Sequence, residues 1–190
     1  ILAFITRKTR DVSTIVGAGS AIIGSLIAVV PVVRVLFNSV ELPLLLLNLP
    51  LGQATLRLDA VSAFFSLPVL LLLAVVALFA GIEAAHDKHA HDGWLFFNFL
   101  GAAMLLLLVA ANAVLFLVAW EMMSVAAFFL IAWRDEIASA RNAAWKFLVA
   151  SHIGTAALML LFAMLGAHAG SYEFAQFSGA HFTDGMASVA

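Results

Sequence analysis

Apolar stretches of about twenty residues recur along this chain, and they restrict its fold more than any other feature. A helix rises about 1.5 Å per residue, so about twenty residues cross a hydrocarbon core of about 30 Å. Hydrophobic residues make up 65% of the 190 positions, well above the roughly 45–50% of an ordinary soluble domain. We therefore predict an all-α polytopic integral membrane protein with five transmembrane helices, at residues 12–37, 60–82, 94–111, 113–133 and 142–165.

Charge and cysteine content exclude several classes of function. The formal net charge is −2, and the absence of a basic excess argues against a nucleic-acid partner. The chain has no cysteine, which excludes disulfides, cysteine-ligated zinc and thiolate-held iron–sulfur clusters within it. It also has no phosphate loop, dinucleotide fingerprint or nucleophile elbow. We expect neither a cofactor nor a catalytic residue in this chain.

Polar residues mark where the apolar stretches begin and reverse. Residues 94–133 form an apolar stretch of about 40 positions, roughly twice one membrane span, so we predict a tight reversal at Asn112. Asp59 can serve as the N-cap of the helix at 60–82. Asn98 is of the type that hydrogen-bonds to a neighbouring helix.

The first two predicted helices are joined by a segment with a different pattern. Polar and apolar side chains alternate between Thr55 and Leu58, and Gly52 can open a tight turn. This pattern predicts a short β-hairpin at the membrane surface. Within the first helix, Gly17, Gly19 and Gly24 are small enough to let another helix approach closely.

Basic residues are distributed unevenly between the two sides of the predicted bundle. Five crossings put the N-terminal segment, the loop at 83–93 and the loop at 134–141 on one side. These segments carry six of the nine Lys and Arg residues: Arg7, Lys8, Arg10, Lys88, Arg134 and Arg141. By the positive-inside rule this side is cytoplasmic, and the hairpin and the C-terminal tail are on the opposite side. We expect the membrane to be a bacterial or archaeal plasma membrane.

Glu121, near the middle of the predicted helix at 113–133, is the residue that most needs an explanation. A carboxylate at the bilayer centre costs at least a few kcal/mol, so it should face the protein interior, a partner or a file of water. Ser124 follows three residues later on the same helix face and can hydrogen-bond within the same polar spot. Glu121 is therefore a candidate proton site, and the alternative is a buried carboxylate that only ties helices together.

Two basic residues in the last predicted helix are candidate partners of Glu121. His152 lies about 15 Å from the cytoplasmic end of its helix, close to the depth of about 18 Å for Glu121, whereas Lys146 lies at about 6 Å. A proton relay from Lys146 through water to His152 and then to Glu121 is conceivable. Lys146 and His152 face different ways on their helix, so the relay would need a lateral step between them. The alternatives are a packing histidine and a lysine that extends to the membrane surface.

Five residues between the second and third predicted helices form an imidazole–carboxylate cluster: His86, Asp87, His89, His91 and Asp92. Such a cluster could bind a transition metal weakly. Its spacing matches no closed zinc site, and a solvated loop explains such residues without ligation. We therefore assign no metal to this chain.

Two segments resemble a known family. Residues 120–124 read Trp-Glu-Met-Met-Ser, and residues 143–155 read Ala-Ala-Trp-Lys-Phe-Leu-Val-Ala-Ser-His-Ile-Gly-Thr. They resemble the proton-conducting antiporter-type subunits of respiratory complex I, Mrp sodium/proton antiporters and membrane-bound group 4 hydrogenases. Residues 57–65 resemble the same family. Residues 151–155 are similar to the large antiporter-like subunit of formate hydrogenlyase and hydrogenase-4.

The resemblance implies a subunit that moves protons through a buried file of Lys, His and Glu side chains. Glu121 matches the glutamate on the family's fifth helix, and Lys146 matches a basic position on the sixth. The family also carries a lysine on its seventh helix and a lysine or glutamate on its twelfth, neither of which is present here. We therefore expect a fragment that corresponds to the second to sixth helices.

The implied function is proton translocation by a non-catalytic subunit of a redox-coupled hydrogenase or complex I-like assembly. Its implied proton pathway contains Glu121, Lys146, His152 and Ser124. Its partners would be the lipid bilayer, protons, and the other membrane and redox subunits of the complex. The alternatives are sodium/proton exchange of the Mrp type and a structural membrane scaffold.

Overall fold

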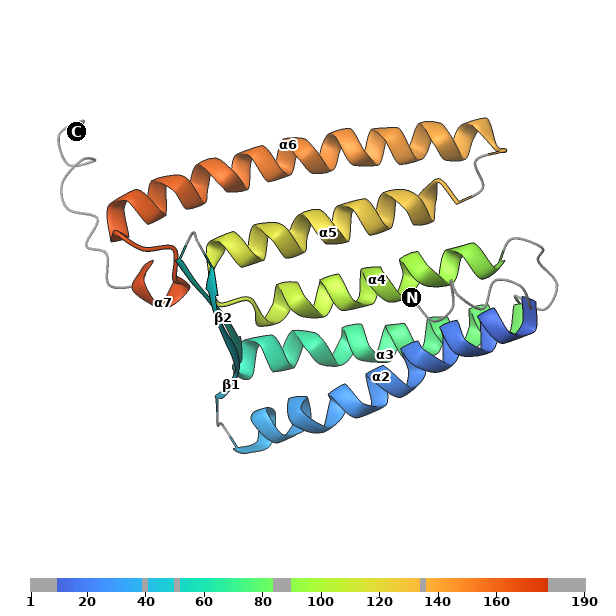
Figure 1. Cartoon of the computed structure of the whole chain (residues 1–190), viewed down its shortest axis with the longest axis horizontal. Helices are drawn as coiled ribbons and strands as arrows, with labels where there is room; N and C mark the ends of the chain where they lie inside the picture. Colours follow the sequence, from blue (N-terminus) through green and yellow to red (C-terminus); the bar gives the residue numbers. More distant parts are fainter. Residues whose placement is uncertain (1–9, 39–40, 50–51, 84–89, 134–135, 178–190) are drawn as a thin grey trace.

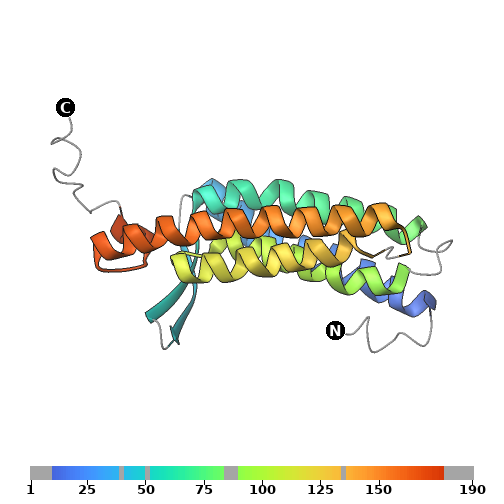
Figure 2. The same cartoon turned by 90° about the horizontal axis from the view of Figure 1, so that it is seen from above.

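The computed structural model describes residues 10–38, 41–49, 52–83, 90–133 and 136–177. Five long helices lie side by side in it: α2 (Arg10–Asn38), α3 (Ala60–Glu83), α4 (Ala90–Val109), α5 (Ala113–Ile131) and α6 (Ala138–Ala169) (Figure 1). A hairpin of β1 (Leu42–Leu49) and β2 (Gly52–Leu58) follows α2, and the short helix α7 (Phe174–Phe177) follows α6. The hairpin and α7 lie at the end of the bundle where α2 ends and α5 begins (Figures 1 and 2).

Four of these helices are long and apolar enough to cross a membrane: Val12–Asn38, Ala60–Glu83, Ala113–Ile131 and Ala138–Ala169. The apolar part of α4, Gly93–Val109, is shorter. Together with the two-stranded antiparallel hairpin, these helices confirm the predicted fold class, and the chain is an integral membrane protein.

The imidazole–carboxylate cluster predicted at residues 86–92 lies outside the described part of the structure. His86, Asp87 and His89 are not described at all. His91 and Asp92 belong to α4, but their side chains are not described.

Most of the buried apolar side chains in the described part of the chain are alanines, while many large apolar side chains point outward. Ala63, Ala77, Ala119 and Ala126 are fully buried, whereas Phe37 is 85% exposed. This arrangement suits a lipid environment, because lipid does not drive large apolar groups inward. Helices in a membrane associate instead by close packing of small residues. Within this packing, α4 contacts α2, α3 and α5, whereas α6 packs mainly against α5.

The ends of the helices differ from the sequence expectation. The last helix begins at Ala138 rather than 142 and continues to Ala169, beyond the predicted end at 165. The prediction followed the apolar composition, but a helix continues through polar residues as long as its backbone hydrogen bonds are satisfied. This helix stops at Gly170, whose φ of 67° is the left-handed conformation that glycine adopts readily at a helix C-terminus.

The predicted N-cap at Asp59 and the predicted reversal at Asn112 are confirmed. The Asp59 carboxylate accepts a hydrogen bond from the Ser62 backbone N–H at 2.7 Å and so caps α3. Asn112 is the N-cap of α5, and its side-chain oxygen accepts from the backbone N–H groups of Val114 and Leu115. In the hairpin, Leu49 pairs with Gly52, so Gly52 begins β2 after the turn instead of opening it, and the two positions between them lie outside the described residues.

A polar junction ties the hairpin to the α4–α5 reversal and to the segment before α7. The Thr55 carbonyl accepts from the Ala111 backbone N–H at 2.9 Å. The Glu173 carboxylate accepts from the Thr55 hydroxyl and from the Asn112 side-chain amide, each at 3.1 Å. The start of α5 is therefore held by its neighbours at this end of the bundle, and this fixes the direction in which its side chains point.

Only one of the three glycines expected to allow close helix packing does so. A Cβ at Gly17 would lie 2.4 Å from Cγ of Trp94, which is buried against α2. A Cβ at Gly19 or Gly24 would meet nothing within 4 Å. The Asn98 side-chain amide donates to the Gly17 carbonyl at 3.0 Å, which confirms the expected hydrogen bond between helices.

We predict that Gly17→Ala destabilises the bundle by about 1–3 kcal/mol, because the added methyl group overpacks the Trp94 contact. Thermal unfolding in detergent measures the effect. Gly24→Ala is the matched control on the same helix, and it should unfold at the wild-type temperature or slightly above, since alanine favours helix. Equal unfolding temperatures for the two variants would contradict the packing role of Gly17.

Candidate functional site

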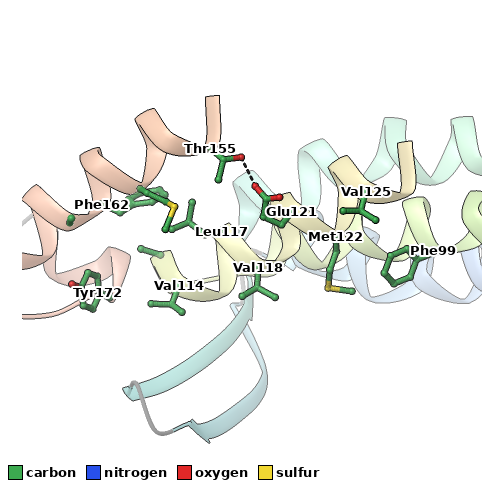
Figure 3. Close-up of a pocket in the computed structure, with 13 residues that line it drawn as sticks. Phe99, Val114, Leu117, Val118, Glu121, Met122, Val125, Thr155, Phe162 and Tyr172 are labelled. Atoms are coloured by element: carbon green, nitrogen blue, oxygen red, sulfur yellow. Dashed lines mark hydrogen bonds between the residues drawn. The ribbon is translucent and has the colours of Figure 1, made fainter. Parts of the chain in front are cut away.

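Glu121 stands near the middle of α5 and faces α6 (Figure 3). Its Oε1 accepts a hydrogen bond from the Thr155 hydroxyl at 2.5 Å. Thr155 is buried, with 7% of its surface exposed, whereas 35% of the Glu121 side chain is exposed. The carboxylate is thus anchored through one oxygen and the side chain is only partly buried, within a helix made mostly of apolar residues.

His152 approaches the second carboxylate oxygen from α6. Its Nε2 lies 3.7 Å from Glu121 Oε2, which is within ion-pair distance but longer than a hydrogen bond. Its Nδ1 lies 2.9 Å from the Leu148 carbonyl oxygen. Because a carbonyl only accepts, Nδ1 carries the hydrogen, and in the neutral ring Nε2 is the lone-pair nitrogen. The nitrogen nearest Glu121 can therefore take up a proton.

Ser124 forms a second polar contact between the same helices, one turn from Glu121 along α5. Its hydroxyl oxygen lies 2.6 Å from that of Ser151, and Ser124 is 1% exposed. Ser151 lies one turn before Thr155 on α6, so the two contacts stack along the α5–α6 boundary. Ser124 therefore belongs to the same polar spot as Glu121, as expected, but it bonds to Ser151.

Lys146 lies apart from these contacts. It is exposed on α6, and among the described residues the ionic partner of Glu121 is His152. The structure thus brings together Glu121, His152 and Ser124 of the predicted pathway and leaves Lys146 at a distance. The sequence reasoning did not assign a role to Thr155, although its spacing of four residues from Ser151 places both on one helix face.

A pocket of about 680 Å³ opens beside Glu121. Its lining comes from α4, α5 and α6 and from the segment after α6. Its polar members are Glu121, Thr155 and Tyr172, and the others are apolar: Phe99, Ala113, Val114, Leu117, Val118, Met122, Val125, Met159, Phe162 and Ala163 (Figure 3). Glu121 is the one carboxylate of this lining. Among the described residues, no group of three or more His, Asp or Glu side chains is arranged to hold a metal ion.

Comparisons with known proteins identify the family of this chain. Residues 110–189, which include α5, α6 and α7, match the family model described as the transmembrane part of NADH:quinone oxidoreductase and Mrp antiporters. Hydrogenase-4 component B of Escherichia coli (strain K12) is 34% identical over 140 residues, which are 73% of this chain and 21% of that protein. The chain belongs to the family of antiporter-like membrane subunits.

Another member extends the comparison. A probable K(+)/H(+) antiporter subunit of Rhizobium meliloti (strain 1021) is 32% identical over 120 residues, which are 63% of this chain and 12% of that protein. This antiporter-like chain therefore spans about a fifth or less of the length of these two relatives.

The fold also matches a solved structure. The matching chain belongs to the membrane-bound sulfane sulfur reductase, an archaeal respiratory membrane complex. The match has a TM-score of 0.78 and 24% identity, and it covers 94% of this chain and 27% of the other. The expected family resemblance is confirmed by the identity with hydrogenase-4 component B. The likeness in fold to the solved structure extends over nearly the whole antiporter-like chain.

We predict strong coupling between Ser124 and Ser151, whose hydroxyls bond to each other. Ser124→Ala should destabilise the protein by about 1 kcal/mol or more, because a polar group of Ser151 then loses its partner between the helices. The double variant Ser124→Ala with Ser151→Ala should recover most of that loss, since both polar groups are gone. Thermal unfolding of the four proteins in detergent measures the coupling, and additive losses would contradict it.

Proposed function

We propose that this chain translocates protons across the membrane as part of an antiporter-like subunit of a redox-coupled hydrogenase or complex I-like assembly. Glu121 is the central proton-binding group of the proposal. The observation that carries it is the arrangement of Glu121 between the Thr155 hydroxyl and the His152 ring, near the middle of an apolar helix. Ionisable groups inside a membrane segment generally mark ion or proton pathways.

The two partners of Glu121 would serve different steps of proton transfer. Thr155 stabilises the carboxylate on Oε1, while Oε2 is free to exchange a proton with Nε2 of His152. Carboxylate and imidazole both change charge readily, so a proton can pass from one to the other over a short distance, directly or through one water. At 3.7 Å, a small side-chain movement of His152 brings Nε2 to hydrogen-bond distance.

Lys146 and Ser124 complete the proposed pathway toward the end of the bundle that holds the start of α6. Lys146 lies about two turns closer to that end than His152, so water would connect the two side chains. Ser124 and its partner Ser151 lie one turn from Glu121 in the same direction. Hydroxyls can both donate and accept, which allows them to support a file of water.

Cation exchange is the second candidate function, because one relative is named as belonging to a probable K(+)/H(+) antiporter. A dehydrated alkali cation needs several oxygen ligands. In the described lining of the pocket, oxygen-bearing side chains are limited to Glu121, Thr155 and Tyr172. This small number of oxygens favours a proton over a metal cation at Glu121.

We predict that Glu121→Gln abolishes proton transfer, because the amide keeps the size of the side chain but does not take up and release a proton. The measurement is proton uptake by vesicles that contain the full-length subunit in its assembled complex. Glu83→Gln, at an exposed position at the end of α3, is the matched control and should leave uptake unchanged.

Three results would contradict the proposed function. Unchanged uptake in Glu121→Gln would exclude it as the proton site. A loss of thermal stability without loss of uptake in the assembled complex would favour the scaffold alternative. Exchange that depends on sodium or potassium without any redox partner would favour the cation exchanger.

The proposal also places the loop after α5 and the N-terminal segment in the cytoplasm, since they are rich in Lys and Arg. Because this chain has no cysteine, single introduced cysteines can report sidedness in a full-length protein whose other cysteines have been removed. In intact cells, a membrane-impermeant maleimide should label Arg57→Cys on the hairpin but label Arg141→Cys only after permeabilisation. The reverse labelling would show that the orientation is inverted.

A further inference from the structure

Thr155 has two acceptors within reach of its single hydroxyl proton. Its Oγ1 lies 2.5 Å from Glu121 Oε1 and 3.1 Å from the Ser151 carbonyl oxygen, one turn earlier on α6. A carbonyl and an ionised carboxylate only accept hydrogen bonds, whereas a hydroxyl donates one and accepts others. The single proton therefore has to be directed to one of the two oxygens at a time.

The choice between them depends on whether Glu121 is ionised. When Glu121 carries a charge, the proton of Thr155 goes to the carboxylate, because hydrogen bonds to an ionised acceptor are the stronger ones. When Glu121 has taken up a proton on Oε1, the new O–H can donate to Thr155 Oγ1. The proton of Thr155 is then free to turn to the Ser151 carbonyl. Glu121 gains one proton, and Thr155 keeps its own proton in both states.

We propose that Thr155 is a positioning residue that holds the Glu121 carboxyl group at one place in both of its protonation states. The inference rests on the proposed function of Glu121 and adds a role for its neighbour. Thr155 is 7% exposed, so water has little access to replace its hydroxyl. The Ser151 carbonyl is the usual acceptor of the Thr155 backbone N–H in the helix, and its second lone pair can receive the hydroxyl without loss of the helical bond.

Other charged groups around Glu121 do not provide this function. On α6, His152 faces the second oxygen, Oε2, while Arg141, Lys146 and His168 are exposed farther along the helix. On α4, the residues from Gly93 to Val109 include no titratable side chain, and on α5 Glu121 is the only one. At the end of the bundle, the Glu173 carboxylate bonds to Thr55 and Asn112 instead.

The test compares Thr155→Val, which has nearly the shape of threonine without the hydroxyl, with Thr155→Ser, which keeps the hydroxyl. The measurement is the pH profile of proton uptake by vesicles that contain the assembled complex. Thr155→Val should lower uptake about tenfold. It should also move the half-maximal pH upward by about one unit, because the ionised form loses its donor and release of the proton becomes harder. Thr155→Ser should restore the wild-type profile.

Two controls keep the outcome decisive. Ser66→Ala removes a buried hydroxyl that donates to the Ser62 carbonyl within α3, outside the proposed pathway, so it should leave the half-maximal pH unchanged. Thermal unfolding of each variant measures any loss of packing, and Thr155→Ala is measured in the same way if Thr155→Val does not assemble.

The results separate the inference from the proposed function. A wild-type profile in Thr155→Val, with uptake lost in Glu121→Gln, would overturn the inference alone. Equal losses in Thr155→Val and Thr155→Ser would assign Thr155 to packing and would also overturn it. Wild-type uptake in Glu121→Gln would overturn the proposed function, whatever Thr155 does.

Discussion

The close approach of α5 and α6 is the constraint on which the rest of the site depends. Lipid gives large apolar side chains no reason to turn inward, and the boundary between these helices contains small buried residues: Ser124 on α5, and Ala144 and Thr155 on α6. At this short separation, side chains as small as serine and threonine reach across the boundary. The Ser124–Ser151 and Glu121–Thr155 bonds are both of this kind, and they place the carboxylate beside His152.

The other end of the bundle determines how α5 is oriented. Asn112 caps its first turn, and Glu173 joins Asn112 to Thr55 of the hairpin. Because these bonds hold the start of a helix whose residues are apolar all round, they help to decide which face of α5 meets α6. The hairpin and the segment before α7 thus contribute to the position of a carboxylate about two and a half turns away from Asn112.

The sequence predicted the elements well and the contacts between them only in part. Long apolar stretches identify membrane helices, and Asp59 and Asn112 mark the starts of helices through local hydrogen bonds, so each can be read from neighbouring residues. The role of Thr155 and the difference between Gly17 and Gly24 depend on which residue of another helix lies opposite. Helices that are apolar on all sides carry little periodic signal for their rotation, which leaves such pairs undetermined until the fold is known.

The central claim is that Glu121 changes its protonation state within the membrane. Infrared difference spectroscopy of the assembled complex during a pH titration tests it most directly, because a protonated carboxyl group has a C=O stretching band that the ionised form lacks. The account predicts a carboxyl band that appears as the pH falls, is absent in Glu121→Gln and remains in Glu83→Gln. A set of carboxyl bands identical in wild type and Glu121→Gln over the whole range of proton transfer would contradict it.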